Sequence, residues 1–207
     1  DEAYANFLEI IATLKSPFRW IPGNHDNAVV MDRLAEGTGA SEKTAQLNNW
    51  LIILLDTSIL GQVHGKLAKK EINFLTSVLR AAERDDTIEH CLITMHHNPV
   101  PGNSAWMKDI GLENGEKFFE AIKISKKVRC VLYGHIHQEL DFEHGGIRCL
   151  CTPSTCIQFK PKVINFSLDM VNPGYRSLQL FADGSIKSEV RRVSGETFEA
   201  DYNSLGY

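Results

Sequence analysis

The sequence predicts an α/β fold in which a mostly parallel β-sheet faces a second, more antiparallel sheet, with helices on the outside. Two observations support this prediction. In the first part of the chain, short apolar runs that end at polar or glycine-containing loops alternate with segments of helical periodicity. In the last part, pairs of short apolar runs flank glycine-containing turns, which is typical of β-hairpins.

Four apolar runs are predicted to be buried strands of the first sheet. Each run is short, and each gives way to a loop that carries polar or glycine residues. A run of this length between turn signals fits a buried strand better than a helix, which needs about ten residues or more. The predicted strands are residues 18–21, 50–55, 91–95 and 128–133.

Helical periodicity separates these runs. Apolar side chains recur at helical spacing in residues 4–14, 67–79 and 116–124, which predicts three amphipathic helices. No internal repeat or low-complexity tract divides the chain. We therefore expect a single domain that spans residues 1–207.

The pattern changes after His137. Two pairs of short strands follow, residues 140–142 with 147–151 and residues 175–181 with 185–190, each pair separated by a turn that contains glycine. These pairs are predicted to form the more antiparallel second sheet.

The composition is that of a globular protein that binds small ligands rather than polyanions. The chain has 207 residues and a net charge of −4, with a pI near 6.1. Proteins that hold nucleic acid usually present a basic face, so nucleic acid is not an expected partner. A small anionic substrate fits if bound metal ions supply positive charge. Nothing in the sequence specifies the oligomeric state.

The sequence also predicts a cytoplasmic protein without membrane contact. No apolar run approaches the roughly 20 residues of a membrane-spanning helix, and the first residues lack the layout of a signal peptide. Cys91 and Cys130 lie in apolar runs, so we expect reduced, buried thiols. A soft metal site at Cys149, Cys151 and Cys156 is disfavoured, because no fourth ligand stands at zinc-ribbon spacing.

Histidines gather where predicted strands end. His25, His96, His97, His135 and His137 are five of the eight histidines, and they follow three strands of the first sheet. Loops at the carboxyl ends of strands are where open α/β sheets bind ligands. Imidazole is a common metal ligand, so the sequence predicts a metal site at this edge of the sheet.

The first of these loops reads Gly23-Asn24-His25-Asp26. Asn24 offers an amide oxygen suited to a divalent cation, and His25 adds a group that can be protonated near neutral pH. The alternative interpretation is an ordinary turn in which Asn24 and Asp26 only bond the backbone.

The other two loops each carry a pair of histidines. His96 and His97 are adjacent, so their side chains point in different directions and only one should reach a given metal. We assign His96 as the ligand and place His97 behind it, with a partly exposed loop histidine as the alternative for His97. In an extended segment His135 and His137 face the same way while Ile136 points into the core, which predicts two imidazoles for neighbouring metals.

These loops together resemble the calcineurin-like metallophosphoesterase superfamily. Its pattern runs Asp-x-His, Gly-Asp, Gly-Asn-His-Asp/Glu, His and Gly-His-x-His, and the last three blocks stand here in that order. Further stretches look like the class III cyclic nucleotide phosphodiesterases, namely residues 55–58, 64–65, 96–99 and 134–141. Those that look like the bacterial cyclic AMP branch are residues 152–161 and the closing Gly206-Tyr207.

The resemblance implies a fold and a set of cofactors. The fold is a two-sheet β-sandwich flanked by helices, in four αββα layers. The cofactors are two divalent metal ions, with iron, manganese and zinc equally suited to the ligands. One ion would be held by Asn24, His96, His135 and a bridging Asp, and the other by that Asp, an Asp-x-His pair and His137.

The first two blocks of the family pattern do not occur in the printed sequence, and Asp1-Glu2-Ala3-Tyr4 resembles the stretch that follows them. We therefore expect an N-terminally truncated, incomplete domain. Such a chain should hold at most one metal well and should be inactive or weakly active by itself.

For the intact protein the resemblance implies hydrolysis of 3′,5′-cyclic AMP to 5′-AMP. His25 would stabilise the reacting phosphate or donate a proton to the leaving oxygen, while Asp26 and Asp56 would orient the surrounding groups. Either carboxylate could instead be an ordinary loop residue. Two alternative functions are a metallophosphoesterase for another phosphodiester, such as a glycerophosphodiester or nucleotide derivative, and a catalytically incomplete metal-binding domain.

Overall fold

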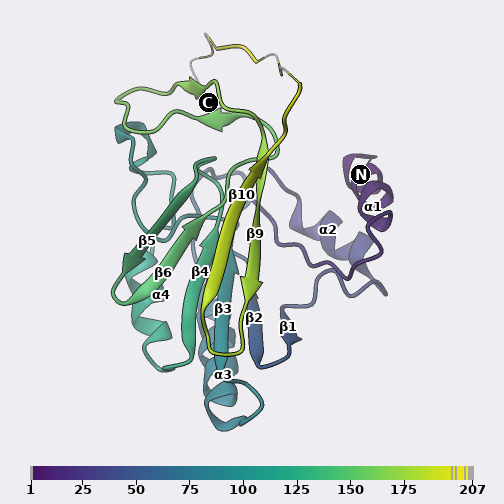
Figure 1. Cartoon of the computed structure of the whole chain (residues 1–207), viewed down its shortest axis with the longest axis vertical. Helices are drawn as coiled ribbons and strands as arrows, with labels where there is room; N and C mark the ends of the chain where they lie inside the picture. Colours follow the sequence, from purple (N-terminus) through teal and green to yellow (C-terminus); the bar gives the residue numbers. More distant parts are fainter. Residues whose placement is uncertain (1, 197, 199, 203, 205–207) are drawn as a thin grey trace.

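The computed structural model describes residues 2–196, 198, 200–202 and 204, and its central element is a six-stranded β-sheet (Figure 1). The strand order is β1-β2-β3-β4-β6-β5. The four inner strands run parallel, whereas the edge strands run antiparallel to their neighbours. The bounds are β1 (Thr44–Leu47), β2 (Trp50–Leu55), β3 (His90–Met95), β4 (Val128–Tyr133), β5 (Leu140–His144) and β6 (Ile147–Cys151).

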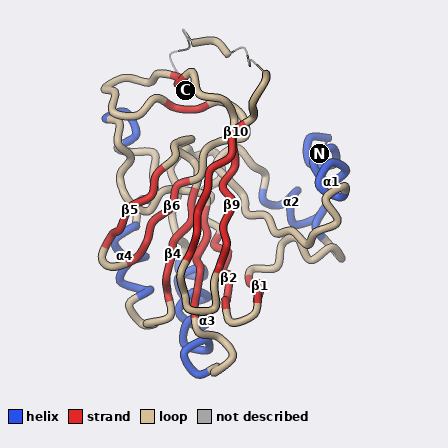
Figure 2. The backbone as a smooth tube through the Cα atoms, viewed as in Figure 1, coloured by secondary structure: helices blue, strands red, loops and turns tan. Residues whose placement is uncertain are grey.

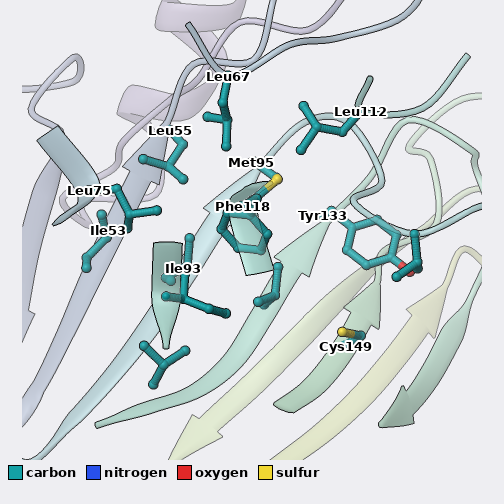
Figure 3. Close-up of a cluster of buried hydrophobic side chains, with 14 of the residues drawn as sticks. Ile53, Leu55, Leu67, Leu75, Ile93, Met95, Leu112, Phe118, Tyr133 and Cys149 are labelled. Carbon is teal, nitrogen blue, oxygen red and sulfur yellow. The ribbon is translucent and has the colours of Figure 1, made fainter. Parts of the chain in front are cut away.

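Helices cover one face of this sheet. Leu75 and Leu79 of α3 (Lys69–Arg84) and Phe118 of α4 (Gly115–Ile122) are fully buried against apolar side chains of β2, β3 and β4 (Figure 3). A short 3-10 helix, η1 (Ala105–Met107), precedes α4. Within the described residues, no helix combines the length and the apolar character that a membrane span requires.

A β-hairpin covers the other face. Its strands are β9 (Gly174–Leu180) and β10 (Ile186–Arg192), which pair along their full length (Figure 2). Leu178, Leu180 and Ile186 pack on a second apolar cluster formed by Trp50, Leu92, Cys130 and Leu150. Because the parallel strands are buried on both faces, their sequences are almost continuously apolar rather than alternating.

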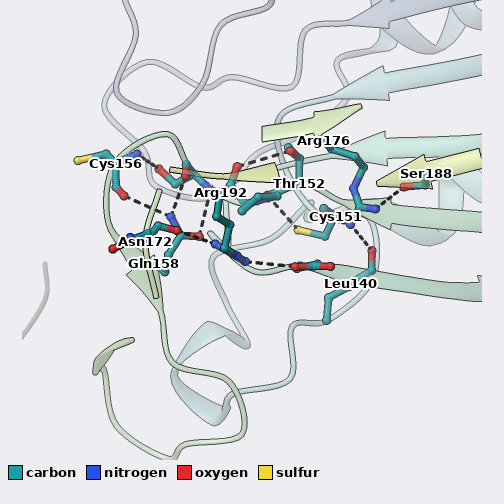
Figure 4. Close-up of polar contacts among 12 residues, drawn as sticks. Leu140, Cys151, Thr152, Cys156, Gln158, Asn172, Arg176, Ser188 and Arg192 are labelled. Carbon is teal, nitrogen blue, oxygen red and sulfur yellow. Dashed lines mark hydrogen bonds and ion pairs between the residues drawn. The ribbon is translucent and has the colours of Figure 1, made fainter. Parts of the chain in front are cut away.

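Hydrogen bonds fix the hairpin at both of its ends. At the turn, the Trp50 indole donates to the Phe181 carbonyl at 2.8 Å. At the opposite end, the guanidinium of Arg176 donates to the carbonyls of Leu140 and Cys151 at 3.1 and 2.7 Å (Figure 4). Two short strands, β7 (Gln158–Phe159) and β8 (Leu168–Asp169), pair beyond this end.

Most predicted elements are present. The expected helices correspond to α1 (Glu2–Ala12), α3 and α4, with ends shifted by a few residues, and the sequence missed the short α2 (Ala28–Ala35). The predicted strands at 50–55, 91–95 and 128–133 are β2, β3 and β4. The α/β fold with a multistranded sheet flanked by helices is therefore confirmed.

The strand predicted at residues 18–21 is wrong. The run has no strand partner among the described residues, although the Trp20 N–H donates to the Ala40 carbonyl at 3.0 Å. Its aromatic rings pack on α1 instead, with Phe7 6.3 Å from Phe18 and 6.1 Å from Trp20 between ring centroids. The apolar side chains of this segment are covered by helix α1, and not by pairing of the segment with another strand.

The second sheet is smaller than predicted. The hairpin of β5 and β6 joins the first sheet, because β6 pairs in parallel with β4. Among the described residues, only β9 and β10 face that sheet as a separate layer. In Figure 1 the described helices α1 and α2 stand beside the sheet rather than over the hairpin, so the described part shows three layers of the four expected.

An ion pair between buried Glu71 and half-buried Lys43 ties α3 to the segment before β1. Glu71 is 5% exposed, and both of its carboxylate oxygens accept from the Lys43 ammonium at 2.6 Å. The same carboxylate accepts from the Asp56 N–H at 3.2 Å, and the Lys43 ammonium lies 4.2 Å from the centre of the Phe74 ring. Glu71 thus anchors the end of β2, where the loop that carries Asp56 and Thr57 begins.

We expect Glu71→Ala to lower the free energy of unfolding by about 2–4 kcal/mol, because it leaves a partly buried ammonium without its partner. Urea unfolding followed by circular dichroism measures this change. Glu120→Ala is the matched control, since Glu120 pairs with Lys123 on the exposed face of α4 and should cost less than about 1 kcal/mol. Equal effects of the two substitutions would contradict the role of Glu71.

Candidate metal centre

Three loops bring one donor atom each to a single point at the carboxyl edge of the sheet. His96 Nε2 lies 3.0 Å from Asn24 Oδ1 and 3.1 Å from His135 Nδ1. His135 Nδ1 lies 3.2 Å from Asn24 Oδ1. The three residues come from the loops after α1, β3 and β4, so the convergence that the sequence predicted for Asn24, His96 and His135 is found.

The orientation of His135 is set by a backbone carbonyl. Its Nε2 donates to the Ile110 carbonyl at 2.9 Å, which leaves Nδ1 as the atom with a lone pair toward the cluster. The backbone of His135 is left-handed, with φ +68°. A left-handed backbone is unfavourable for a residue with a side chain and persists only where surrounding contacts hold it. At His135 this conformation directs the imidazole toward the cluster.

His137 lies beside the cluster rather than within it. Its backbone is also left-handed, at φ +48°, so the extended geometry predicted for this loop is wrong, although Ile136 is fully buried as expected. The imidazole stacks on Phe159 at 4.2 Å with an interplanar angle of 10°. Its Nδ1 is buried and has no hydrogen-bond partner among the described residues. That atom is therefore available to a ligand.

His97 supports the cluster and does not offer it a donor atom. Its Nδ1 lies 2.7 Å from Thr57 Oγ1 and its Nε2 lies 3.1 Å from the Val63 carbonyl, so both nitrogens have partners. The ring centroid is 4.6 Å from that of His135. The side chain is fully buried, which rules out the alternative of a partly exposed loop histidine.

Glycines make room for the two adjacent imidazoles. A Cβ at Gly23 would lie 2.8 Å from the His96 ring, and a Cβ at Gly65 would lie 2.2 Å from Nδ1 of His97. Contacts this short cannot be accommodated without displacing the rings. The Gly23 and His64-Gly65 segments noted in the sequence are therefore required by packing.

Asp26 holds the turn that carries Asn24 and His25. Its carboxylate accepts from the Gly23 N–H at 2.8 Å and from the Tyr4 hydroxyl at 3.0 Å. The Tyr4 oxygen in turn accepts from the Asn27 N–H at 2.7 Å. Asp26 therefore bonds the backbone, as the ordinary-turn alternative expects, but Asn24 does more than that because its amide reaches the histidines.

The two remaining predicted residues stand apart from the three donor atoms. His25 is exposed on the same turn as Asn24, and its charge acts on both His96 and His137. The Asp56 carboxylate accepts from the backbone N–H and hydroxyl of Ser58, at 2.8 and 2.7 Å, and acts on His97 only electrostatically. Asp56 thus shapes the loop under His97.

Burial keeps the clustered imidazoles neutral. Burial, together with repulsion from neighbouring histidines, lowers the pKa of His96 to about 3 and that of His135 to about 2. Burial also lowers the pKa of His137 to about 4, against an opposing effect of the Ile157 backbone. Neutral imidazoles have lone pairs available at neutral pH, so metal binding there requires no loss of protons.

The donor set and its spacing suit a divalent cation. Donor atoms that each lie about 2.1 Å from a common ion, at right angles to one another, are about 3 Å apart. The mutual distances of 3.0, 3.1 and 3.2 Å agree with that spacing. Two imidazole nitrogens and an amide oxygen are ligands that iron, manganese and zinc accept.

The other histidines and the cysteines have structural roles. His90 is buried and bonds the Ala182 carbonyl at 2.9 Å, and His144 is exposed at the end of β5, with its ring centroid 4.4 Å from that of Phe119. Cys91 and Cys130 are buried free thiols as expected, and burial raises the pKa of Cys130 to about 12. Among the described residues no cysteine takes part in a metal-binding group.

Sequence reasoning missed the groups that orient the imidazoles. Ile110 acts through its carbonyl, which no sequence pattern reveals. Phe159 lies 22 positions beyond His137 and becomes its neighbour only because β7 folds back over the site. Tyr4 entered the sequence analysis only as part of the first predicted helix and of the family-like opening, without a role at the site. Thr57 had a weak signal, since it stands two residues after the end of β2.

Comparison with known proteins identifies the family. Residues 1–139 match the family model described as calcineurin-like phosphoesterase. The chain belongs to this family. Its members are phosphoester hydrolases that use a dinuclear centre of divalent metal ions, which agrees with the donor set at the sheet edge.

Relatives match over the full length of the chain. It is 40% identical over 206 residues to the 3′,5′-cyclic adenosine monophosphate phosphodiesterase CpdA of Pseudomonas aeruginosa, covering 100% of this chain and 74% of that protein. It is 38% identical over 207 residues to CpdA of Escherichia coli K12, with 99% and 74% covered. A 3′,5′-cyclic-nucleotide phosphodiesterase of Nostoc sp. is 36% identical over 193 residues, with 93% and 71% covered.

A solved structure supports the fold. The dimetal phosphatase from Danio rerio superimposes with a TM-score of 0.61 at 14% identity, covering 91% of this chain and 74% of that one. Identity this low shows a shared fold and nothing about the substrate.

We expect Phe159→Leu to release the His137 ring, because leucine removes the stacked face while keeping the site apolar. The loss of aromatic packing should cost about 1–2 kcal/mol of unfolding free energy. Histidine ring resonances in NMR spectra should show a downfield shift for His137, since the ring current of Phe159 is gone. Phe166→Leu is the control. It removes a ring whose centroid lies 5.4 Å from that of Phe159, but it keeps the Phe159 ring that stacks on His137. An unmoved His137 resonance in Phe159→Leu would contradict the stacking role.

Proposed function

We propose that this protein hydrolyses 3′,5′-cyclic AMP to 5′-AMP with divalent metal ions held at the carboxyl edge of its parallel sheet. The observation that carries the proposal is the meeting of Asn24, His96 and His135 donor atoms within 3.0–3.2 Å. The relatives named CpdA are cyclic AMP phosphodiesterases by name, and their match over the whole chain supports the choice of substrate.

Asn24, His96 and His135 would hold one metal ion, and His137 would contribute to the second. The buried Nδ1 of His137, which has no partner among the described residues, supports the latter assignment. Bound divalent ions supply Lewis-acid polarisation of the phosphoryl oxygens and activate water as a nucleophile. We propose iron, manganese or zinc, because the ligand chemistry suits each of them.

His25 is our candidate for a catalytic residue. It is exposed beside Asn24, and its position lets it influence His96 and His137 electrostatically. From there the imidazole can face the substrate phosphate without being a metal ligand. We assign it to charge stabilisation of the reacting phosphate or to proton donation to the 3′ leaving oxygen.

His97, Asp26 and Asp56 would act by holding the ligands in place. His97 is braced by Thr57 and the Val63 carbonyl, and its ring packs against both His96 and His135. Asp26 fixes the Asn24 turn through the Gly23 N–H. We further propose a cytoplasmic location, which the reduced thiols of the buried cysteines favour.

The proposal is tested by hydrolysis assays on protein loaded with manganese, iron or zinc. This chain and a version extended to the length of its relatives are assayed in parallel against cyclic AMP, a glycerophosphodiester and bis(p-nitrophenyl) phosphate. We expect cyclic AMP to have the highest kcat/KM and 5′-AMP to be the product. Preference for another phosphodiester would favour the rival substrate class, and no hydrolysis by either version would favour a non-catalytic metal-binding domain.

His25→Ala and His137→Ala should have opposite signatures. We expect His25→Ala to lower kcat by about 10²- to 10³-fold while metal content stays unchanged, since the side chain acts on the phosphate. His137→Ala should lose bound metal first, as measured by metal analysis after dialysis. His144→Ala, at the exposed end of β5, is the control and should change neither property. Equal loss of metal in both variants would refute the role of His25.

A further inference from the structure

An exposed apolar pocket lies next to the candidate metal centre. It has a volume of about 310 Å³ and is bounded by the segments 155–158 and 168–173 together with the C-terminal residues 193, 198, 200 and 202. In Figure 1 the C-terminal segment, in yellow, continues from the end of β10 to the top of the molecule. Pockets of this size and apolar character suit a small organic group.

The pocket gathers apolar side chains that are unusually exposed. Among its lining residues are Ile157 at 36%, Met170 at 81%, Val171 at 41%, Phe198 at 43% and Tyr202 at 43% exposure. Single exposed apolar residues are common, but several around one hollow mark a binding surface. Two of them are aromatic rings, which can stack on a flat partner.

Hydrogen bonds hold the walls of the pocket together. The Asn172 side-chain amide donates to the carbonyls of Val193 and Glu196 at 2.9 and 3.2 Å, and the Val193 N–H donates to the Pro173 carbonyl at 2.9 Å. The Gln158 amide donates to the carbonyls of Ser154 and Cys156 at 2.7 and 3.2 Å (Figure 4). These bonds hold the walls formed by residues 154–158, 172–173 and 193–196 in place before a ligand arrives, which lowers the entropic cost of binding.

The same segment joins the pocket to the metal centre. Gln158 and Phe159 form β7, and Phe159 stacks on His137 while the Ile157 backbone lies against the same imidazole. Ile157 and Gln158 also line the pocket. A phosphodiester bound at His137 would thus have this pocket beside it.

We propose that the pocket receives the adenine base of the cyclic nucleotide, with the apolar residues on its faces and Asp169 as an acceptor for its amino group. This inference rests on the proposed function. A purine has two flat apolar faces and a polar edge, and the pocket pairs aromatic and aliphatic side chains with the Asp169 carboxylate. A second copy of this chain is the alternative occupant of an exposed apolar surface.

The first test measures adenosine binding by saturation-transfer NMR and calorimetry, which needs neither bound metal nor hydrolysis. We expect wild-type protein to bind adenosine, and to bind inosine, which lacks the amino group, about fivefold more weakly. Met170→Glu places a charge at the apolar face and should weaken adenosine binding about tenfold or more. Absence of adenosine binding by the wild-type protein would overturn the inference.

Ile164→Glu is the matched control. Ile164 is 79% exposed on the β7–β8 connection, whereas Met170 directly follows β8; Ile164 does not line the pocket, so its substitution should leave adenosine binding unchanged. Both positions are exposed, so neither variant should fail to fold. Equal weakening in the two variants would show a general effect of added negative charge and would count against the base pocket.

Kinetics and light scattering separate this inference from its rivals. In the active protein, Met170→Glu should raise KM for cyclic AMP about tenfold and leave kcat/KM for bis(p-nitrophenyl) phosphate, which has no base, unchanged. If Met170→Glu instead turns a dimer into a monomer without changing adenosine binding, the patch is a self-association surface and the inference fails. Adenosine binding without cyclic AMP hydrolysis would overturn the proposed function alone, whereas hydrolysis unaffected by Met170→Glu would overturn the pocket alone.

Discussion

The close approach of three neutral donor atoms at the edge of the sheet is the constraint on which the rest of the structure depends. Asn24 Oδ1, His96 Nε2 and His135 Nδ1 lie within 3.2 Å of one another in a partly buried site. Neutral His96 can carry its single N–H at Nε2 and donate it to Asn24 Oδ1 or to His135 Nδ1, but one such proton cannot lie between all three atoms. A divalent cation can bind all three atoms at once, so the geometry suits a metal-ligand set.

The parallel sheet provides the rigidity that this arrangement needs. Its inner strands are buried between helices and a hairpin, so the ends of β3 and β4 are fixed in position. The histidines that follow occupy left-handed backbone conformations at positions 135 and 137, which nonglycine residues avoid unless tertiary contacts hold them. Those contacts are the Ile110 carbonyl for His135 and the Phe159 ring for His137. The strain is thus offset by packing and serves to aim the imidazoles.

Two kinds of surface meet where β7 passes the metal centre. On one side lie polar donor atoms that suit ions and phosphate oxygens, and on the other lies a preformed apolar hollow. Ile157 and Gln158 line the pocket and the next residue, Phe159, stacks on His137, so one short segment contributes to both surfaces. A substrate that combines a phosphodiester with a flat base matches this division. The shared strand also means that orientation of the ligand set and shape of the pocket are mechanically linked.

The sequence by itself determined the order of the main strands and helices along the chain and the residue types at their ends. Apolar runs bounded by turn residues identified β2, β3 and β4, and the loops after β3 and β4 identified His96 and His135, because these signals are local; Asn24 was found from its Gly23-Asn24-His25-Asp26 loop although the strand predicted before it is absent. Tertiary structure decided what depends on distant partners. The run 18–21 packs on a helix instead of joining a ladder, β6 joins the first sheet, and His97 is committed to Thr57 and Val63. Strand pairing and side-chain orientation depend on contacts between segments far apart in the chain, so a local sequence pattern cannot predict them.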